Sequence, residues 1–216
     1  MKRAFDFALA LFGLGISWPL WLLFSLAIWL EDFGPVFYLQ ERVGLNAKLF
    51  KGVKFRSMKA AADKGAEFLQ AEEHDTRVTK FGRFLRITAM DELPQLINIL
   101  KGEMSFVGPR ALVPKEQETH EGRARSVFDF AGFQERSKVR PGLTGVAQVF
   151  AARDVSRERK FKYDIWYIKN RTFFLDIRLI LLSFLVTFGG RWEIRKEKFA
   201  FLNQDLLRRR IESELP

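Results

Sequence analysis

The sequence predicts a helix-rich, mixed α/β fold with one apolar segment near its N-terminus. Three observations support this prediction. Residues 8–30 carry no charged side chain, residues 36–58 contain two strand-like runs around a glycine-containing turn, and helical spacing of apolar residues is found in residues 93–100 and in the C-terminal third. We therefore expect a β-hairpin, a membrane helix and several further helices in one compact unit.

Composition narrows the classes of function. The chain has 216 residues, no cysteine and two histidines, His74 and His120, which are far apart in the sequence. Disulfides, thiolate zinc sites and Ser-His-Asp triads are therefore not expected. Lysine and arginine number 36 against 26 acidic residues, giving a net charge of +10, and 14% of residues are aromatic. This balance indicates a phosphate-rich partner, either nucleic acid or an anionic membrane.

The first thirty residues favour the membrane. Residues 8–30 are uncharged over 23 positions, which is long enough to span a bilayer and longer than a signal-peptide core. Pro19 lies near the middle of this run, so a kink is expected there. Each half could cross only one leaflet. On the residues alone a spanning helix is favoured over a re-entrant one, and both alternatives stay open.

The next segment predicts a β-hairpin. Strand-like residues follow Gly34-Pro35, a turn falls at residues 44–46, and a second strand runs to about residue 58. Lys54 and Arg56 should project from the same side of that second strand, because side chains alternate. Residues 59–80 are polar and lack a strong period, which predicts a loop with a short helix.

The most informative segment is residues 86–103, where two adjacent acids precede a helix. Asp91 and Glu92 are followed by Pro94, which suits the first helical position, and Gly102 suits the helix end. An apolar stripe with helical spacing begins directly after the acid pair: Leu93, Leu96, Ile97 and Leu100. The two carboxylates should therefore lie at a helix mouth, where backbone donors favour bound phosphate. This arrangement indicates phosphoryl chemistry.

A purely structural explanation competes with this one. Acids in a first helical turn stabilise the helix, and Thr88 with Asp91 resembles a capping box. That box would place Pro94 about six residues into the helix, at a cost of roughly 3 kcal/mol. Cationic residues also approach the acid pair: Arg77, Lys80, Arg83 and Arg86 recur every three residues, and Arg110 and Arg140 lie beside Gly-Pro and Pro-Gly pairs. Rigidly held arginines suit phosphate recognition.

The C-terminal third predicts two helices and a tail. In residues 157–170 the aromatic residues Tyr163, Trp166 and Tyr167 alternate with charges, which predicts an interfacial helix. Residues 172–188 are apolar apart from Asp176 and Arg178, so a core or interfacial helix fits better than a span. Residues 191–216 form a basic amphipathic tail.

Several separated motifs together resemble the bacterial sugar transferases, the monotopic phosphoglycosyl transferases. They are GPVFYLQERVG, KFRSM, MDELPQLINILKGEMSFVGPR, KVRPGLTGVAQV and KYDIWYIKN, in the family's order, and the resemblance covers residues 2–188. It implies a re-entrant helix in residues 1–32, a catalytic domain with interfacial helices in residues 33–190 and a separate tail in residues 191–216. It also implies a minimal catalytic unit, because larger relatives carry additional membrane helices.

The resemblance implies transfer of a phosphosugar from a nucleotide diphosphate sugar, usually a UDP-sugar, to polyprenyl (undecaprenyl) phosphate, with release of UMP. Asp91 matches the family nucleophile and would form a covalent aspartyl-phosphosugar intermediate. Glu92 would hold Mg²⁺, for which Mn²⁺ can substitute. Four residues would bind phosphate groups and an acid would complete the site: Lys54, Arg86, Arg110 and Arg140, with Asp164. Ala111 and Val146 depart from the family's usual residues, which leaves the sugar unassigned.

The resemblance further implies a place on the cytoplasmic face of the bacterial inner membrane, at the start of glycan assembly. The expected partners are the nucleotide sugar, the polyprenyl phosphate and the lipid bilayer, and a homodimer is allowed. Nucleic acid is not expected, because it leaves residues 8–30 unexplained and no recognised binding motif is present. A non-enzymatic adaptor that binds anionic lipid is the alternative, although it gives no reason for the acid pair at Asp91.

Overall fold

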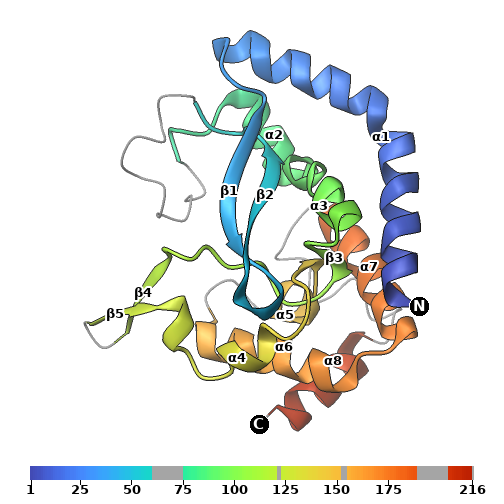
Figure 1. The fold of residues 1–216 in the computed structure, drawn as a ribbon, viewed down its shortest axis with the longest axis vertical. Helices are drawn as coiled ribbons and strands as arrows, with labels where there is room; N and C mark the ends of the chain where they lie inside the picture. Colours follow the sequence, from blue (N-terminus) through green and yellow to red (C-terminus); the bar gives the residue numbers. More distant parts are fainter. Residues whose placement is uncertain (60–74, 121–122, 152–154, 189–203, 216) are drawn as a thin grey trace.

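The computed structural model describes residues 1–59, 75–120, 123–151, 155–188 and 204–215 (Figure 1). Within these residues the chain is rich in helices and has three two-stranded sheets, which agrees with the predicted helix-rich α/β class. In chain order the elements are α1 (Lys2–Asp32), β1 (Phe37–Val43), the 3-10 helix η1 (Leu45–Ala47), β2 (Leu49–Phe55), α2 (Lys80–Ile87), the 3-10 helix η3 (Met90–Glu92), α3 (Gln95–Lys101), β3 (Ser105–Val107), β4 (Gln117–His120), β5 (Arg123–Ser126), the 3-10 helix η4 (Val127–Asp129), α4 (Phe133–Arg136), β6 (Gly142–Thr144), α5 (Val146–Phe150), α6 (Arg157–Asn170), α7 (Phe173–Phe188) and α8 (Gln204–Glu214).

The predicted hairpin is confirmed. Strands β1 and β2 pair antiparallel, with Phe37 opposite Phe55 and Val43 opposite Leu49. The turn contains Asn46 at φ 54°, a left-handed conformation that asparagine tolerates better than most residues. Residues directly opposite each other share a face of the sheet, so this register determines which side chains of β1 lie beside Lys54. The predicted loop at 59–80 lies largely outside the described residues.

A second sheet joins two segments that are distant in the sequence. Strands β3 and β6 pair in parallel, with Ser105 opposite Gly142 and Val107 opposite Thr144. The two backbones approach closely just after β3, because a Cβ on Gly142 would lie 2.1 Å from the backbone nitrogen of Gly108. Only glycine fits at that position. The loop that carries Arg110 is therefore held against the start of β6.

The largest core cluster lies where α5, α6 and α7 meet, and it corrects one prediction. Tyr163, Trp166 and Tyr167 of α6 are between 2% and 4% exposed and pack in this core. The prediction that they lie at a membrane surface is therefore wrong. Their i, i+3, i+4 spacing gathers them on one helix face, and that face is covered by neighbouring helices. Helix α8 closes the cluster with Ile211, which is fully buried, and its Glu214 accepts a hydrogen bond from Trp166.

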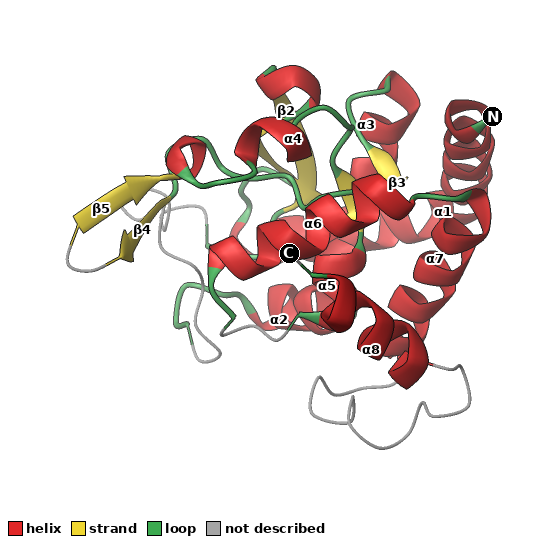
Figure 2. Cartoon of the chain, turned by 90° about the horizontal axis from the view of Figure 1, so that it is seen from below, coloured by secondary structure: helices red, strands yellow, loops and turns green. Residues whose placement is uncertain are grey.

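Helix α7 has one buried and one exposed apolar face. Leu179 and Leu182 are buried in the core, whereas Phe174 is 81% exposed and Phe184 61%. Figures 1 and 2 both show α7 beside the N-terminal part of α1, where the rings of Phe5 and Phe173 are in contact. The β4–β5 hairpin, in contrast, extends away from the body (Figure 2). The exposed face of α7 thus continues the apolar surface of α1.

Helix α1 is a single 31-residue helix that continues through Pro19 and is bent part-way along its length (Figure 1). Among the described residues it is the one helix long and apolar enough to cross a membrane. Most of its large apolar side chains are exposed, including Phe12, Trp18 and Leu22. The exposed side chains would require lipid or protein cover, because an apolar area of this extent is unfavourable in water.

Both ends of α1 are fastened to the same body by polar contacts. At the N-terminal end, Lys2 Nζ lies 2.5 Å from Asp176 Oδ2, and Asp6 Oδ2 accepts a hydrogen bond of 2.8 Å from the Ser105 hydroxyl. At the C-terminal end, the Arg56 guanidinium, which is buried, pairs with the Asp32 carboxylate. The two ends of the helix therefore contact residues of one globular unit.

Candidate active site

The acid pair lies in a sharp reversal between two helices, close to where the sequence places it. Helix α2 ends at Ile87, and Ala89 at φ 54° then turns the chain into η3, which contains Asp91 and Glu92. Helix α3 follows from its N-cap Pro94 and ends at Gly102, whose φ of 83° is the left-handed conformation that favours glycine. The predicted end of this helix at Gly102 is confirmed, and the helix begins one residue later than predicted, with Pro94 as its N-cap. Leu96 and Ile99 of α3 pack in one core cluster with Ala10 of α1, so the helix behind the carboxylates is held in place by this packing.

Lys54 from the hairpin lies between the two carboxylates. Its Nζ is 2.5 Å from Glu92 Oε1 and 3.9 Å from Asp91 Oδ2. The Asp91 side chain is 14% exposed and that of Glu92 is 22% exposed. One ammonium group therefore serves two largely buried acids, and it lies closer to Glu92.

This unequal sharing separates the pKa values of the two acids. Burial raises the pKa of Asp91 from 3.8 to about 6, against the opposing attraction of Lys54 and Arg86. Burial also acts to raise the pKa of Glu92, but Lys54 and Arg110 outweigh it and lower the value from 4.5 to about 2. Glu92 is a firmly ionised acid, whereas Asp91 carries a charge that its surroundings disfavour.

The structure brings three of the predicted cationic residues to the acid pair. Lys54 contacts both acids, the charge of Arg86 lowers the pKa of Asp91, and the charge of Arg110 lowers that of Glu92. Arg86 is oriented by its Nε, which donates a hydrogen bond of 2.8 Å to the Ser57 hydroxyl. The geometry is suited to binding a group with several negative charges.

Two predicted site residues lie in supporting positions instead. The Nε of Arg140 donates a 2.7 Å hydrogen bond to the carbonyl oxygen of Gly102 at the end of α3. Asp164 is 3% exposed and forms a buried ion pair of 3.0 Å with Arg136, which in turn donates to the carbonyl oxygen of Arg110. Neither Arg140 nor Asp164 lines the pocket described next.

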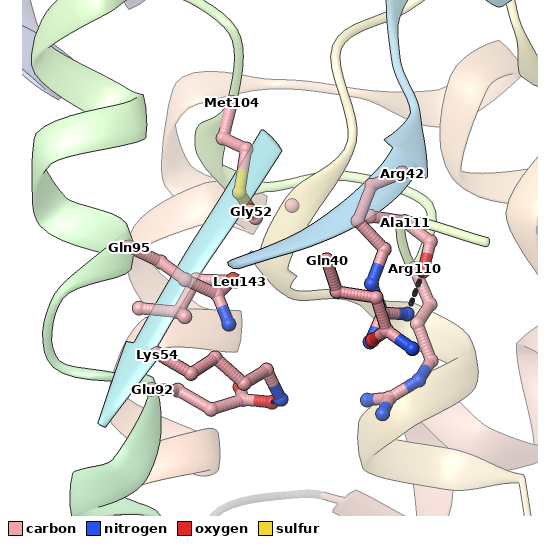
Figure 3. A pocket seen from close by; sticks show the side chains of 11 residues that line it. Gln40, Arg42, Gly52, Lys54, Glu92, Gln95, Met104, Arg110, Ala111 and Leu143 are labelled. Atoms are coloured by element: carbon pink, nitrogen blue, oxygen red, sulfur yellow. Dashed lines mark hydrogen bonds and ion pairs between the residues drawn. The ribbon is translucent and has the colours of Figure 1, made fainter. Parts of the chain in front are cut away.

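A partly open cavity adjoins the acid pair on the side of Glu92. Figure 3 shows Lys54, Glu92 and Gln95 on one side and Gln40, Arg42 and Arg110 on the other. The lining residues are Gln40, Arg42, Gly52, Lys54, Glu92, Gln95, Met104, Arg110, Ala111, Gly142 and Leu143. They come from the hairpin, from the segment that runs from η3 through α3 to Met104, from the loop that carries Arg110 and from β6. The fold therefore assembles the cavity from segments that are far apart in the sequence.

Arg42 is a lining residue that the sequence analysis missed. It lies on the same face of the hairpin as Lys54, because Arg42 is opposite Phe50 and Lys54 is opposite Tyr38 in the register. Even-numbered residues of both strands share that face. Strand alternation combined with the length of the turn would have identified it.

The acid pair is also suited to a divalent cation that is bound mainly by the phosphates of a substrate. Among the described residues, no cluster of three or more histidine, cysteine or acidic side chains could enclose a metal ion. Mg²⁺ is commonly bound by one or two carboxylates together with the phosphates of a substrate. Glu92, with its lowered pKa, supplies an ionised oxygen donor suited to such a site.

Comparison with known proteins identifies relatives over most of the chain. Residues 1–190 match the family described as bacterial sugar transferase. The chain is 39% identical to a UDP-glucose:undecaprenyl-phosphate glucose-1-phosphate transferase of Xanthomonas campestris pv. campestris, over 88% of this chain and 39% of that protein. It is 40% identical to the uncharacterized sugar transferase EpsL of Bacillus subtilis (strain 168), over 85% of each chain.

A third relative is named for a different sugar. It is a UDP-N-acetylgalactosamine-undecaprenyl-phosphate N-acetylgalactosaminephosphotransferase of Aeromonas hydrophila, 38% identical over 88% of this chain and 45% of that protein. The chain therefore spans less than half the length of the two relatives named for a specific sugar, and most of the length of EpsL.

Proposed function

This chain belongs to the bacterial sugar transferase family, and on this premise we propose that it is a phosphoglycosyl transferase. It transfers a phosphosugar from a UDP-sugar to polyprenyl phosphate, most simply undecaprenyl phosphate, and releases UMP. The observation that carries the proposal is the largely buried Asp91, whose pKa is raised to about 6, in contact with Lys54 and beside Glu92. Such a carboxylate is a stronger nucleophile than a solvated one, because water does not shield it.

The proposed reaction has two steps at one site. In the first, a carboxylate oxygen of Asp91 attacks the sugar-bearing phosphorus, and the bond from that phosphorus to the bridging oxygen breaks. The bridging oxygen keeps the electron pair and leaves with UMP, so Asp91 carries the phosphosugar as an acyl phosphate. In the second, an oxygen of polyprenyl phosphate attacks the same phosphorus and displaces Asp91. Covalent catalysis lets both substrates use one site in turn.

The cationic residues reduce the repulsion between an anionic nucleophile and an anionic substrate. Lys54, Arg86 and Arg110 all act electrostatically on the acid pair, so they are placed to neutralise a diphosphate bound between them. Glu92 would hold Mg²⁺, which when bound neutralises phosphate charge; Mn²⁺ can substitute. Arg140 and Asp164 support this arrangement through the end of α3 and through Arg136.

The fastening of α1 supports a re-entrant or in-plane helix. A helix of 31 residues is about 46 Å long, so a straight spanning helix would place its ends on opposite sides of a bilayer. Lys2 and Asp32 instead pair with residues of one globular body, which cannot lie on both sides. We propose that this body lies on the cytoplasmic face of the bacterial inner membrane, where it begins glycan assembly. The expected homodimer stays a prediction.

Intact-protein mass spectrometry tests the proposal directly. The purified protein and its Asp91→Asn variant are exposed to a panel of UDP-sugars with Mg²⁺ and without lipid acceptor. A mass increase equal to one phosphosugar on the unmodified protein alone would support the intermediate and identify the sugar. Glu92→Gln, which retains Asp91, is the matched control and should form the same adduct more slowly.

One outcome would favour the non-enzymatic adaptor instead. That outcome is the lack of any adduct together with no UMP release when polyprenyl phosphate is also supplied. Release of UMP by Asp91→Asn at the unmodified rate would refute the role assigned to Asp91.

A further inference from the structure

The cavity beside the acid pair has a second cationic wall, and the two-step reaction above gives a role to Arg110 in this wall but none to Arg42. Gln40 and Arg42 of β1 and the neighbouring Arg110 face Lys54 and Glu92 across it (Figure 3). Glu92 lines the cavity and the neighbouring Asp91 does not. The cavity therefore begins beside the acid pair, on the side of Glu92, and extends toward these arginines. A ligand that enters the cavity with its reacting atom near Asp91 would place its other end against this wall.

Two hydrogen bonds hold the Arg42 guanidinium in place. Its Nη1 donates a 2.9 Å hydrogen bond to the carbonyl oxygen of Ala111, and its Nη2 donates to Gln40 Oε1. These bonds use two of its five N–H groups and fix the plane of the fork. An oriented guanidinium with remaining donors is suited to a phosphate, which it can bind through two parallel hydrogen bonds.

Arg42 and Arg110 bring two positive charges close together in this wall. Burial and the nearby charge of Arg110 lower the pKa of Arg42 to about 10, although Glu92 and Glu116 partly oppose them. Glu92 is itself engaged by Lys54 at 2.5 Å. A bound anion would relieve the repulsion between the two arginines, so the free protein holds this wall in a state that favours anion binding.

We propose that Arg42, together with Arg110, binds the phosphate that leaves with the nucleotide, and so forms a separate subsite for UMP. This inference rests on the proposed function. When the bond between the sugar-bearing phosphorus and the bridging oxygen breaks, that oxygen keeps the electron pair, and the departing phosphate gains a negative charge. Two guanidinium groups at that position compensate the charge as it develops.

The elements that supply the lining residues indicate that the cavity binds the nucleotide and not the lipid acceptor. None of them belongs to α1 or α7, the two helices that carry the most exposed large apolar side chains, such as Phe12 and Phe174. A polyprenyl tail would approach along those helices, whereas a water-soluble nucleotide sugar can reach the cavity from the hairpin side. The two substrates would then contact Asp91 from different directions.

The test measures UMP and uridine binding by isothermal titration calorimetry in detergent. The proteins compared are the unmodified chain, Arg42→Met, Arg42→Lys and the control Arg125→Met, which removes a positive charge on β5. Arg42→Met should weaken UMP binding about tenfold or more and leave uridine binding within about twofold, because uridine lacks the phosphate. Arg42→Lys should restore part of the UMP affinity, and Arg125→Met should bind UMP like the unmodified protein.

Two results would overturn the inference while leaving the proposed function intact. One is unchanged UMP affinity in Arg42→Met. The other is an equal loss of UMP and uridine affinity, which would assign Arg42 a structural role through its bond to Ala111. If the unmodified protein binds neither UMP nor any UDP-sugar, the proposed function itself fails, and the inference fails with it.

Discussion

The two adjacent acids should have opposite effects on stability, which can be measured without any substrate. Asp91→Asn removes a charge whose pKa burial raises from 3.8 to about 6, and Glu92→Gln removes one whose pKa Lys54 and Arg110 help to lower from 4.5 to about 2. Each tenfold change in proton affinity between the folded and unfolded states corresponds to about 1.4 kcal/mol. Both shifts therefore correspond to about 3 kcal/mol, with opposite signs.

The sign follows from proton binding in the two states. Between pH 3.8 and 6 the folded state binds more protons at Asp91 than the unfolded state does, so stability falls as pH rises through this window. At pH 8 the whole cost is present, and Asp91→Asn should be about 3 kcal/mol more stable than the unmodified protein. Glu92 contributes stability that is present above pH 4.5 and is lost as pH falls toward 2. Glu92→Gln should therefore be about 3 kcal/mol less stable at pH 8.

Unfolding followed by tryptophan fluorescence in one detergent, with a chelator present, provides the measurement. For a chain of this length 3 kcal/mol corresponds to a Tm difference of roughly 6–12 °C. The gain from Asp91→Asn should be constant above pH 6 and disappear near pH 4. A lower Tm for Asp91→Asn than for the unmodified protein at pH 8, or equal shifts in the two variants, would refute the assignment of these charges.

Further predictions concern the rate, the backbone, the fastening of α1 and the apolar surface. The kcat/KM for the UDP-sugar should fall about tenfold per pH unit below pH 6, as Asp91 becomes protonated; a flat profile to pH 5 would contradict this. Ala89→Gly should raise the free energy of unfolding by about 1 kcal/mol in chemical denaturation, because alanine is strained at φ 54°; a loss would contradict it. Lys2→Met should lower that free energy by about 2 kcal/mol, because buried Asp176 loses its cation, whereas the exposed control Lys48→Met should not. Phe174→Ser should weaken flotation with anionic vesicles about tenfold at unchanged Tm, since this ring is 81% exposed; unchanged flotation would refute a lipid contact there.

Local patterns were sufficient to predict the parts of the site that are close in sequence. Pro94 and Gly102 mark the two ends of a helix that directly follows Asp91 and Glu92, and the structure has this helix at Gln95–Lys101. The hairpin was predicted for the same reason, since alternation and a glycine turn are local signals. The family resemblance, which five ordered motifs carry, supplied the chemistry that these local patterns only indicate.

Features that depend on distant contacts could not be predicted in the same way. The parallel pairing of β3 with β6 joins Ser105 to Gly142, and no local pattern marks two three-residue strands as partners. Alternating aromatic and charged residues fit a helix at a membrane surface and a helix packed against a core equally well. The pattern around Tyr163 therefore could not show that this side chain is buried in the core. The buried partner of Asp164, Arg136, lies 28 residues earlier, and no local pattern pairs the two. In each case the missing information is which face another segment covers.

The fastening of α1 has a consequence for the order of events during synthesis. Lys2 and Asp176 are separated by 174 positions, so the helix exists long before its anchor is made. At about 5–20 residues per second the delay is roughly 10–35 s. During that time this ion pair cannot hold the N-terminal end of α1, whereas Arg56, the partner of Asp32, is made only 24 positions after it. The C-terminal end of the helix can therefore be attached early, and Lys2 attaches the N-terminal end only when the C-terminal third of the chain has been made.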